Sequence, residues 1–265
     1  MTARDRTGFA LAVSMFSALP VPVRLIGTDR LDRPASRAAL RWLPVLGALL
    51  GALAGAVGAL LLIRTGSPLL AAVVVVLALA LGTAALHLDG LADTADGLGS
   101  RAPAPAALEI MHRGDVGPFG VVVICGVLLL EVSTLVALIE PGHPWHLVAA
   151  VVVAAVTGRL GALHAGLPGI AAAGGSSFGS LVTGSVSHRS AVAITLLAAV
   201  ATGALAVASD HSPVRWLLAQ AAVLLILWWC RRAVTGRLGG ITGDVFGALI
   251  ELGTALSLLA LVLAG

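Results

Sequence analysis

The sequence predicts an all-α integral membrane protein, in which about seven transmembrane helices form a bundle behind a short N-terminal helix. Of its 265 residues, 58% are hydrophobic and only 11% are charged, whereas soluble domains average about 25% charged residues. Long apolar stretches alternate with polar turns, and the arginines are distributed very unevenly among those turns. We expect a single transmembrane domain over residues 1–265.

The first apolar stretch, residues 8–23, is predicted to lie at the membrane surface or to re-enter the membrane. It is short, it is interrupted by Ser14 and Ser17, and Pro20 and Pro22 stand near its end. About 20 apolar residues are needed to cross a bilayer, so this stretch is not counted as a span. It also lacks the features of a cleavable signal peptide.

Seven later stretches come close to the roughly 20 apolar residues of a transmembrane helix. Their approximate bounds are 42–63, 68–87, 117–139, 146–166, 191–208, 214–230 and 244–264. Orientation follows from the arginines, because cytoplasmic loops carry the excess of basic residues. With the N-terminus inside, thirteen arginines fall in cytoplasmic segments and two, Arg64 and Arg215, fall outside. Loops 88–116, 167–190 and 231–243 are therefore predicted to face the cytoplasm.

Charge and cysteine usage argue against several other classes of protein. The net charge is only +3 and the arginines are spread over many turns, so a nucleic-acid partner is not expected. Cys125 and Cys230 both fall inside apolar stretches, which argues against a disulfide framework or a cysteine-based zinc site. No pair of the seven histidines has a spacing typical of metal ligands.

The polar segment 84–101 carries three carboxylates, Asp89, Asp93 and Asp96, at positions i, i+4 and i+7. On a helix these offsets place all three within roughly 60° of one another, where like charges repel. A Mg²⁺ ion would remove the repulsion, since it binds carboxylate oxygens and keeps water and phosphate oxygens as its other ligands. Gly90 beside the acids would let a backbone or a ligand approach closely. The alternative is a solvated acidic loop between two buried helices.

A second motif, residues 236–253, combines a glycine-rich turn with two further acids. Gly240 and Gly243 lead into a helix that carries Asp244 and, seven residues later, Glu251. Free N–H groups at a helix N-terminus bind phosphate, and an acid there favours a metal between protein and phosphate. Alternatively, the glycines serve helix packing and Asp244 is the N-cap. Glu251 would lie about 10 Å further along the helix, where an unpaired charge is costly.

Two more polar segments are candidates for parts of a site. In the turn 111–120, Arg113 is a candidate for binding phosphate, and Asp115 either joins a metal site or caps a helix that begins near Val116. Residues 167–190 are rich in Gly and Ser, a composition typical of a flexible lid over a substrate or of a simple linker.

Isolated charges within the spans are further candidates. Arg159 lies in the fourth span, where an arginine either binds an anion such as phosphate or extends to the membrane surface. Glu131 lies deep in the third span, without a partner that the sequence identifies. His87 and His112 adjoin the acidic segment.

Two of these motifs, HLDGLADTADGL (87–98) and GGITGDVFGALIE (239–251), together resemble the cobalamin synthase family, adenosylcobinamide-GDP ribazoletransferase. The resemblance covers most of the chain, including the turn MHRGDVGPFG, where Arg113 and Asp115 stand in the reverse order to the family pattern. It implies a Mg²⁺-dependent membrane enzyme that joins adenosylcobinamide-GDP to α-ribazole or its 5′-phosphate and releases GMP. It also implies that Mg²⁺ is held by Asp89, Asp93, Asp96 and Asp244, with Glu251 as a ligand or close behind.

The residues suit such a reaction chemically. When a ribose hydroxyl displaces GMP from a diphosphate, negative charge builds on the phosphoryl oxygens, and carboxylate-bound metal ions stabilise it. Substrate contacts are expected from Arg159, Arg113, His87, Glu251, Gly240 and Gly243. The bilayer is the other expected partner, in the cytoplasmic membrane with the active site facing the cytoplasm, and the sequence leaves a homo-oligomer open.

Two other functions remain open from the sequence alone. A CDP-alcohol phosphotransferase uses similar acid-rich helices, but its pattern has an arginine where Asp93 stands here. A cation-coupled transporter would also place acids in a membrane bundle, although secondary transporters bind their ions near the midplane and these acids are predicted at its edge.

Overall fold

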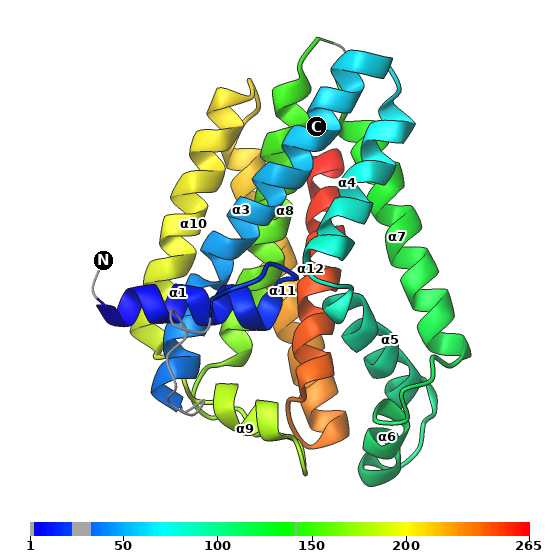
Figure 1. The fold of residues 1–265 in the computed structure, drawn as a ribbon, viewed down its shortest axis with the longest axis vertical. Coiled ribbons are helices and arrows are strands. Elements are labelled where there is room, and N and C mark those ends of the chain that lie inside the picture. The colour runs from blue at the N-terminus through cyan, green and yellow to red at the C-terminus, as the bar shows by residue number, and fades with distance from the viewer. Residues whose placement is uncertain (1–2, 23–32, 141) are drawn as a thin grey trace.

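A computed structural model describes residues 3–22, 33–140 and 142–265, and the regular structure in these residues is α-helical (Figure 1). The helices, in chain order, are α1 (Ala3–Phe16), α3 (Arg33–Thr65), α4 (Pro68–Gly82), α5 (Leu86–Gly99), α6 (Ala104–Met111), α7 (Pro118–Leu138), α8 (Pro144–Ala165), α9 (Ser177–Val182), α10 (His188–Ala208), α11 (Pro213–Leu238) and α12 (Gly243–Ala264). The only β-type pairing among the described residues is an isolated bridge between Ala172 and Ile241. The all-α prediction is confirmed. Arg24 and Arg30, two of the thirteen arginines counted as cytoplasmic, lie outside the described residues.

In the described part of the chain, six helices are long and apolar enough to cross a membrane, namely α3, α7, α8, α10, α11 and α12. They correspond to six of the seven predicted spans. α11 runs on to Leu238, so most of the predicted loop 231–243 is helical and only a short turn joins α11 to α12. The protein is therefore a polytopic helical membrane protein, as its composition predicts.

The remaining predicted span, residues 68–87, is not a single straight helix, so this prediction is wrong. α4 ends at Gly82, and α5 leaves it at an angle of 87°. Ala84 and Ala85 between the two helices have φ angles of 51° and 56°, a left-handed conformation that costs about 1–2 kcal/mol for a residue with a side chain. Hydropathy does not register this break, because the residues at the bend are as apolar as those of the helix. The bend brings α5, and the acids on it, into contact with α12.

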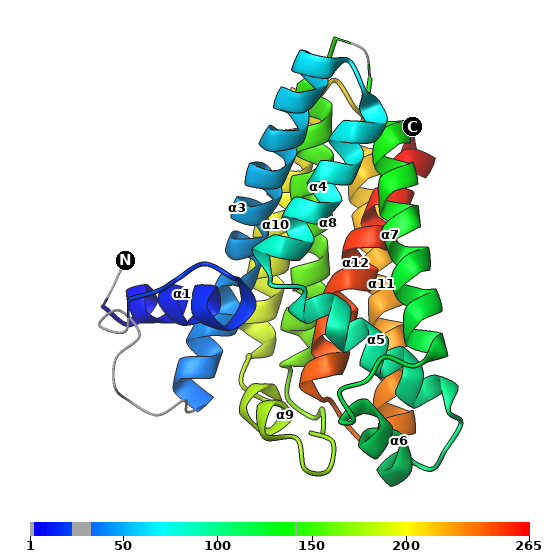
Figure 2. The same ribbon diagram turned by 45° about the vertical axis from the view of Figure 1, so that its right-hand side comes forward.

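α1 lies across the long axis of the bundle and packs against α3 (Figures 1 and 2). The packing is close, since a Cβ added at Gly8 would lie 2.7 Å from the Cβ of Ala38. The Phe16 ring stacks on that of Phe246 in α12, with centroids 5.6 Å apart. The predicted N-terminal helix is thus present, but it ends at Phe16 and does not continue to residue 23, which lies outside the described residues.

α8 is the central helix of the bundle, packed between α3 and α12 and buried along most of its length. Glycines allow the backbones to touch. A Cβ added at Gly47 of α3 would lie 2.7 Å from the Ala155 carbonyl oxygen, and one added at Gly253 of α12 would lie 2.6 Å from the Gly158 Cα. Membrane helices often pack through small residues in this way, because van der Waals contact drives their association. The bundle therefore encloses the polar side chains of α8.

α6, α9 and the turn between α11 and α12 lie together at one end of the bundle, whereas the C-terminus and the connection between α7 and α8 lie at the other (Figures 1 and 2). This agrees with the predicted grouping of loops 88–116, 167–190 and 231–243. The Gly/Ser-rich segment 167–190 is not an irregular linker. It carries α9, and the Ile241 N–H donates to the Ala171 carbonyl oxygen at 2.9 Å, so it packs on the turn that leads into α12.

Candidate active site

Helices α5 and α12 cross with their backbones in contact, and the predicted acids flank the crossing. A Cβ added at Gly90 would lie 2.7 Å from the carbonyl oxygen and 2.9 Å from the Cα of Asp244. A Cβ added at Gly247 would lie 3.2 Å from the Cα of His87. The α5–α12 crossing therefore brings together two motifs that are about 150 residues apart in the chain.

Asp93 lies at the centre of the acid group. Its half-buried carboxylate feels the negative charges of Asp244, Asp89 and Asp96. Asp89 is exposed, Asp244 is half-buried and Asp96 is buried, so the group runs from the surface into the bundle. His112 is close enough to Asp93 and Asp244 to act on both electrostatically, as its position beside the acidic segment predicts.

The acids are neighbours without converging on one point. In the part of the chain that the structure describes, no three of these carboxylates bring their oxygens within 4.8 Å of one another. Mutual repulsion keeps like charges apart in the absence of a counter-charge. The donor set, carboxylate oxygens with one member open to solvent, is nevertheless the kind that Mg²⁺ prefers.

Asp96 has a further role, helix capping, which the sequence analysis gives as one of two alternatives for Asp115. The Asp96 Oδ2 accepts the Gly117 N–H at 2.7 Å, and its Oδ1 accepts the Gly120 N–H at 2.9 Å. These donors belong to the N-terminus of α7, which begins at Pro118 with Gly117 as N-cap. The alternative in which Asp115 caps a helix beginning near Val116 is therefore wrong, because a carboxylate from α5 provides the capping. Asp115 itself is exposed.

The start of α12 differs from the N-cap alternative as well. Thr242 is the N-cap, and its hydroxyl accepts the Val245 N–H at 3.2 Å. Asp244 lies in the first turn, where its carboxylate interacts with the Thr242 hydroxyl and with its own backbone N–H. Gly240 serves close packing, since a Cβ there would lie 2.3 Å from the Ala173 nitrogen. Gly243 is less crowded, with the Phe178 ring 3.6 Å from such a Cβ.

A buried group of charges lies next to the α5–α12 crossing. Arg159 is only 4% exposed, so the alternative in which it extends to the membrane surface is wrong. Its guanidinium Nη1 donates to the Ala155 carbonyl oxygen at 3.3 Å, and the charges that attract it are those of Glu251 and Glu131. Glu131 therefore lies within electrostatic reach of Arg159 and of the like-charged Glu251, although its Oε1 has no hydrogen-bond partner among the described residues.

His87 connects this buried group to the α5–α12 crossing. Its Nδ1 lies 3.7 Å from the Glu251 Oε1, and the two side chains are 2% and 13% exposed. Neither ring nitrogen of His87 has a hydrogen-bond partner among the described residues. The predicted residues His87, Glu251 and Arg159 therefore lie together beneath the acids, whereas Arg113 is exposed and forms no ion pair within the described part of the chain.

A pocket of about 800 Å³ opens on the other side of the turn between α11 and α12. Gly239 and Gly240 line it together with Trp228, Arg231 and Arg232, and the segment 167–171 closes one side. The Arg231 Nε is buried without a hydrogen-bond partner among the described residues. The sequence analysis uses these arginines only as evidence for the orientation in the membrane and misses a binding role for them. The signal that could have revealed this role is their position just before the glycine-rich turn.

Comparison with known proteins places these motifs in a family. The sequence profile described as "Cobalamin-5-phosphate synthase" matches residues 8–262. A relative named adenosylcobinamide-GDP ribazoletransferase from Frankia casuarinae is 39% identical over 99% of this chain and 95% of its own length. A relative of the same name from Klebsiella pneumoniae is 38% identical over 96% of this chain and 98% of its own. No solved structure matches the chain.

Proposed function

The chain belongs to the cobalamin-5-phosphate synthase family and is a membrane-bound transferase of cobalamin biosynthesis, and from this premise we propose its substrates, cofactor and site. It transfers the cobinamide phosphate group of adenosylcobinamide-GDP to α-ribazole or α-ribazole 5′-phosphate. The products are GMP and adenosylcobalamin or its 5′-phosphate. The observation that carries this proposal is the α5–α12 crossing, where Asp89 and Asp93 meet Asp244 beside an open surface.

We propose that the acids at the α5–α12 crossing bind Mg²⁺. Asp89, Asp93 and Asp244 provide direct ligands, and Asp96, whose oxygens already accept two N–H bonds, shares the site from its edge. Bound there, Mg²⁺ would offset the charge of the diphosphate and of the transition state. The crowding of negative charge around Asp93 supports this assignment, because an ordinary structure would not assemble it without a cation.

The reaction forms one P–O bond and breaks another. A ribose hydroxyl of α-ribazole attacks the phosphorus that carries the cobinamide, and the bond from that phosphorus to the GMP oxygen breaks. The hydroxyl proton passes to a carboxylate of the α5–α12 crossing. In-line approach requires the two substrates to be held on opposite sides of the phosphorus.

Arginines supply the contacts to the phosphates in this proposal. Arg113 is the candidate for direct contact, because it is exposed, follows His112, whose charge acts on Asp93 and Asp244, and has no carboxylate partner among the described residues. Arg159 is buried with Glu251 and Glu131, so we expect no direct contact with the phosphate. Its proposed role is to hold Glu251 and His87 in position. The N-terminus of α12, at Gly243, offers N–H groups to the same anion. Arg231 and Arg232 in the adjacent pocket suit the nucleotide part.

The deciding experiment uses purified protein in detergent with adenosylcobinamide-GDP, α-ribazole and Mg²⁺. We expect GMP release in step with formation of the corrinoid product, and loss of both on chelation of Mg²⁺. Parallel reactions with a CDP-alcohol and an inositol or glycerol phosphate acceptor test the phosphotransferase alternative. Activity only with the CDP-alcohol, or no GMP release by well-folded protein, would overturn the proposal.

We also propose that the end carrying α6 and α9 faces the cytoplasm, on the basis of the arginine distribution. In a variant without Cys125 and Cys230, single cysteines at Ser100 and Thr65 report on opposite ends of the bundle, since both positions are exposed. A membrane-impermeant maleimide applied to intact cells should label Thr65→Cys and spare Ser100→Cys. The reverse pattern would invert the orientation.

A further inference from the structure

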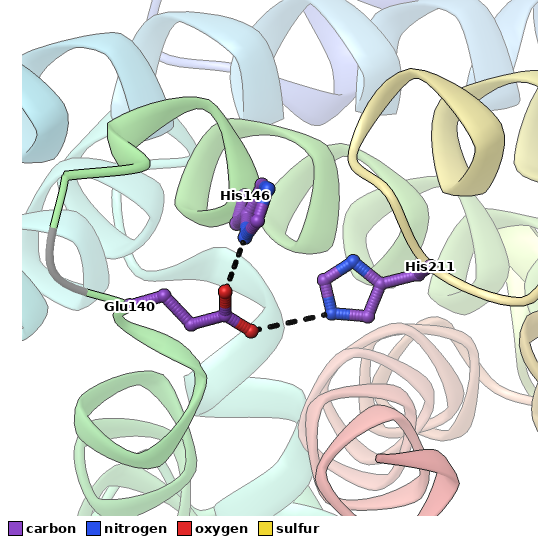
Figure 3. Close-up of side chains that lie close together, drawn as sticks. All are labelled: Glu140, His146 and His211. Carbon is purple, nitrogen blue, oxygen red and sulfur yellow. Dashed lines mark ion pairs between the residues drawn. The ribbon is translucent and has the colours of Figure 1, made fainter.

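At the end of the bundle opposite the α5–α12 crossing, three potential metal ligands from different elements meet (Figure 3). Glu140 follows α7, His146 lies in the first turn of α8, and His211 lies in the turn between α10 and α11. One ligand atom from each lies within 4.8 Å of the others. Among the described residues this is the one group of His, Cys, Asp or Glu side chains that is so close.

We propose that Glu140, His146 and His211 form a second metal site, for a divalent transition metal such as Zn²⁺. The Glu140 Oε2 lies 3.1 Å from the His146 Nδ1, and its Oε1 lies 3.6 Å from the His211 Nε2. Two imidazole nitrogens and one carboxylate are a known protein ligand set for Zn²⁺, with a fourth position left to water. This proposal does not rest on the proposed reaction.

A buried imidazole nitrogen that faces a carboxylate without forming a hydrogen bond to it points to a ligand at this site. His146 is 6% exposed, and its Nδ1, the atom that faces Glu140, has no hydrogen-bond partner among the described residues. A buried polar atom left in this state destabilises the folded protein. A metal ion bound between the His146 Nδ1 and the Glu140 carboxylate would satisfy both.

The surrounding residues hold the two rings in position. The His211 Nδ1 faces the Ser209 carbonyl oxygen at 2.5 Å, so this nitrogen carries the proton and the Nε2 lone pair is directed toward Glu140. A backbone carbonyl bonded to the far nitrogen of a ligating histidine is a usual feature of metal sites. The His146 ring stacks on that of His143, with centroids 4.8 Å apart, and the His211 ring rests on Trp216 at 5.1 Å.

The ligand chemistry separates this site from the acids of α5 and α12. Imidazole nitrogen suits Zn²⁺ and its neighbours among the transition metals, whereas Mg²⁺ prefers oxygen ligands. A bound ion would tie the α7–α8 connection to the turn between α10 and α11. The sequence does not reveal this, because the two histidines are far apart in the chain and neither spacing nor motif connects them.

The test is direct metal binding by tag-free, chelator-treated protein in detergent. Calorimetry and elemental analysis should find one tightly bound Zn²⁺ per chain that excess Mg²⁺ does not displace. Co²⁺ in its place should give the visible absorption of a four-coordinate site with nitrogen ligands. Absence of Zn²⁺ binding, or a Co²⁺ spectrum of an all-oxygen octahedral site, would overturn the proposal.

Variants assign the ligands. Glu140→Gln, His146→Asn and His211→Gln should each weaken Zn²⁺ binding by at least about 100-fold, more than the loss of an outer hydrogen-bond partner usually costs. The matched control is Asp210→Asn, which removes an exposed carboxylate next to His211 and leaves the ligand set intact. Because His146 is buried, the His146→Asn result counts only if the metal-free variant unfolds at the same midpoint as metal-free wild type. If it does not, the test rests on the variants of the two more exposed ligands, Glu140 and His211. If Glu140→Gln and His211→Gln both bound Zn²⁺ with the affinity of wild type, the assignment of these ligands would be wrong.

Discussion

Gly90 of α5 lies directly against the backbone of Asp244 in α12, close enough that a Cβ on Gly90 would stand 2.7 Å from the Asp244 carbonyl oxygen. This contact fixes how far Asp89 and Asp93, on either side of Gly90 in α5, can be from Asp244. The spacing of the carboxylates across the α5–α12 crossing therefore depends on the absence of a single methyl group.

The first prediction concerns that contact. Gly90→Ala should push α5 and α12 apart and lower kcat for GMP release by at least about tenfold, because catalytic geometry tolerates displacements of only about 1 Å. Gly126→Ala in α7 is the matched control, since a Cβ there meets nothing within 4 Å. That variant should keep full activity and gain a little stability from the better helix former. Equal behaviour of the two variants would contradict the role given to Gly90.

The second prediction concerns the metal ligands. Asp93→Asn and Asp244→Asn each remove a charge with little change in volume, so the unfolding midpoint should stay close to that of wild type while kcat falls about 100-fold or more. GMP release measured over a range of Mg²⁺ concentrations checks this, with Glu109→Gln on the exposed face of α6 as control. Near-normal turnover of Asp93→Asn at low Mg²⁺ would mean that these acids do not share a metal.

The third prediction separates Asp96 from Asp115. Asp96→Ala removes both acceptors at the N-terminus of α7 and should lower the free energy of unfolding by about 2 kcal/mol, the upper range for a helix cap. Asp115→Ala removes an exposed carboxylate and should change it by less than about 0.5 kcal/mol. Thermal unfolding in detergent without Mg²⁺ makes the comparison independent of metal binding. A smaller loss for Asp96→Ala than for Asp115→Ala would refute the capping role.

The features that the sequence predicts correctly are those that depend on residues close together in the chain. Spans are read from local hydropathy, and the acids of α5 from local helical spacing, so six spans and the clustering of Asp89, Asp93 and Asp96 on one short helix are as expected. The bend at Ala84 and Ala85 is a local backbone choice that apolar side chains do not signal. It therefore had to come from the structure.

Contacts between distant segments are the other part that the sequence leaves undecided. The sequence suggests Asp115 as a cap for α7 because it lies next to that helix, and only the path of α5 brings Asp96 there instead. Glu131 comes within electrostatic reach of Arg159 and Glu251 only when α7, α8 and α12 pack together. His146 and His211 meet because two turns are adjacent at one end of the bundle (Figure 3).

The fourth prediction distinguishes the two arginines proposed for the phosphates. Arg113 is exposed, so Arg113→Gln should leave the unfolding midpoint unchanged and raise KM for adenosylcobinamide-GDP by about tenfold or more, the effect of losing one charge-assisted hydrogen bond. KM for α-ribazole should stay the same. Arg64→Gln, at the opposite end of the bundle and also exposed, is the matched control and should change neither constant.

Arg159 should behave differently because it is buried beside Glu251 and Glu131. Arg159→Leu removes the buried cation that attracts both carboxylates and should lower the free energy of unfolding by more than the exposed Arg113→Gln does. Arg159→Lys keeps the charge without the planar fork, so it should fold and show a lower kcat with a smaller change in KM. If Arg159→Lys instead raised KM for the nucleotide substrate as much as Arg113→Gln, with kcat intact, Arg159 would contact the phosphate directly and the two assignments would have to be exchanged.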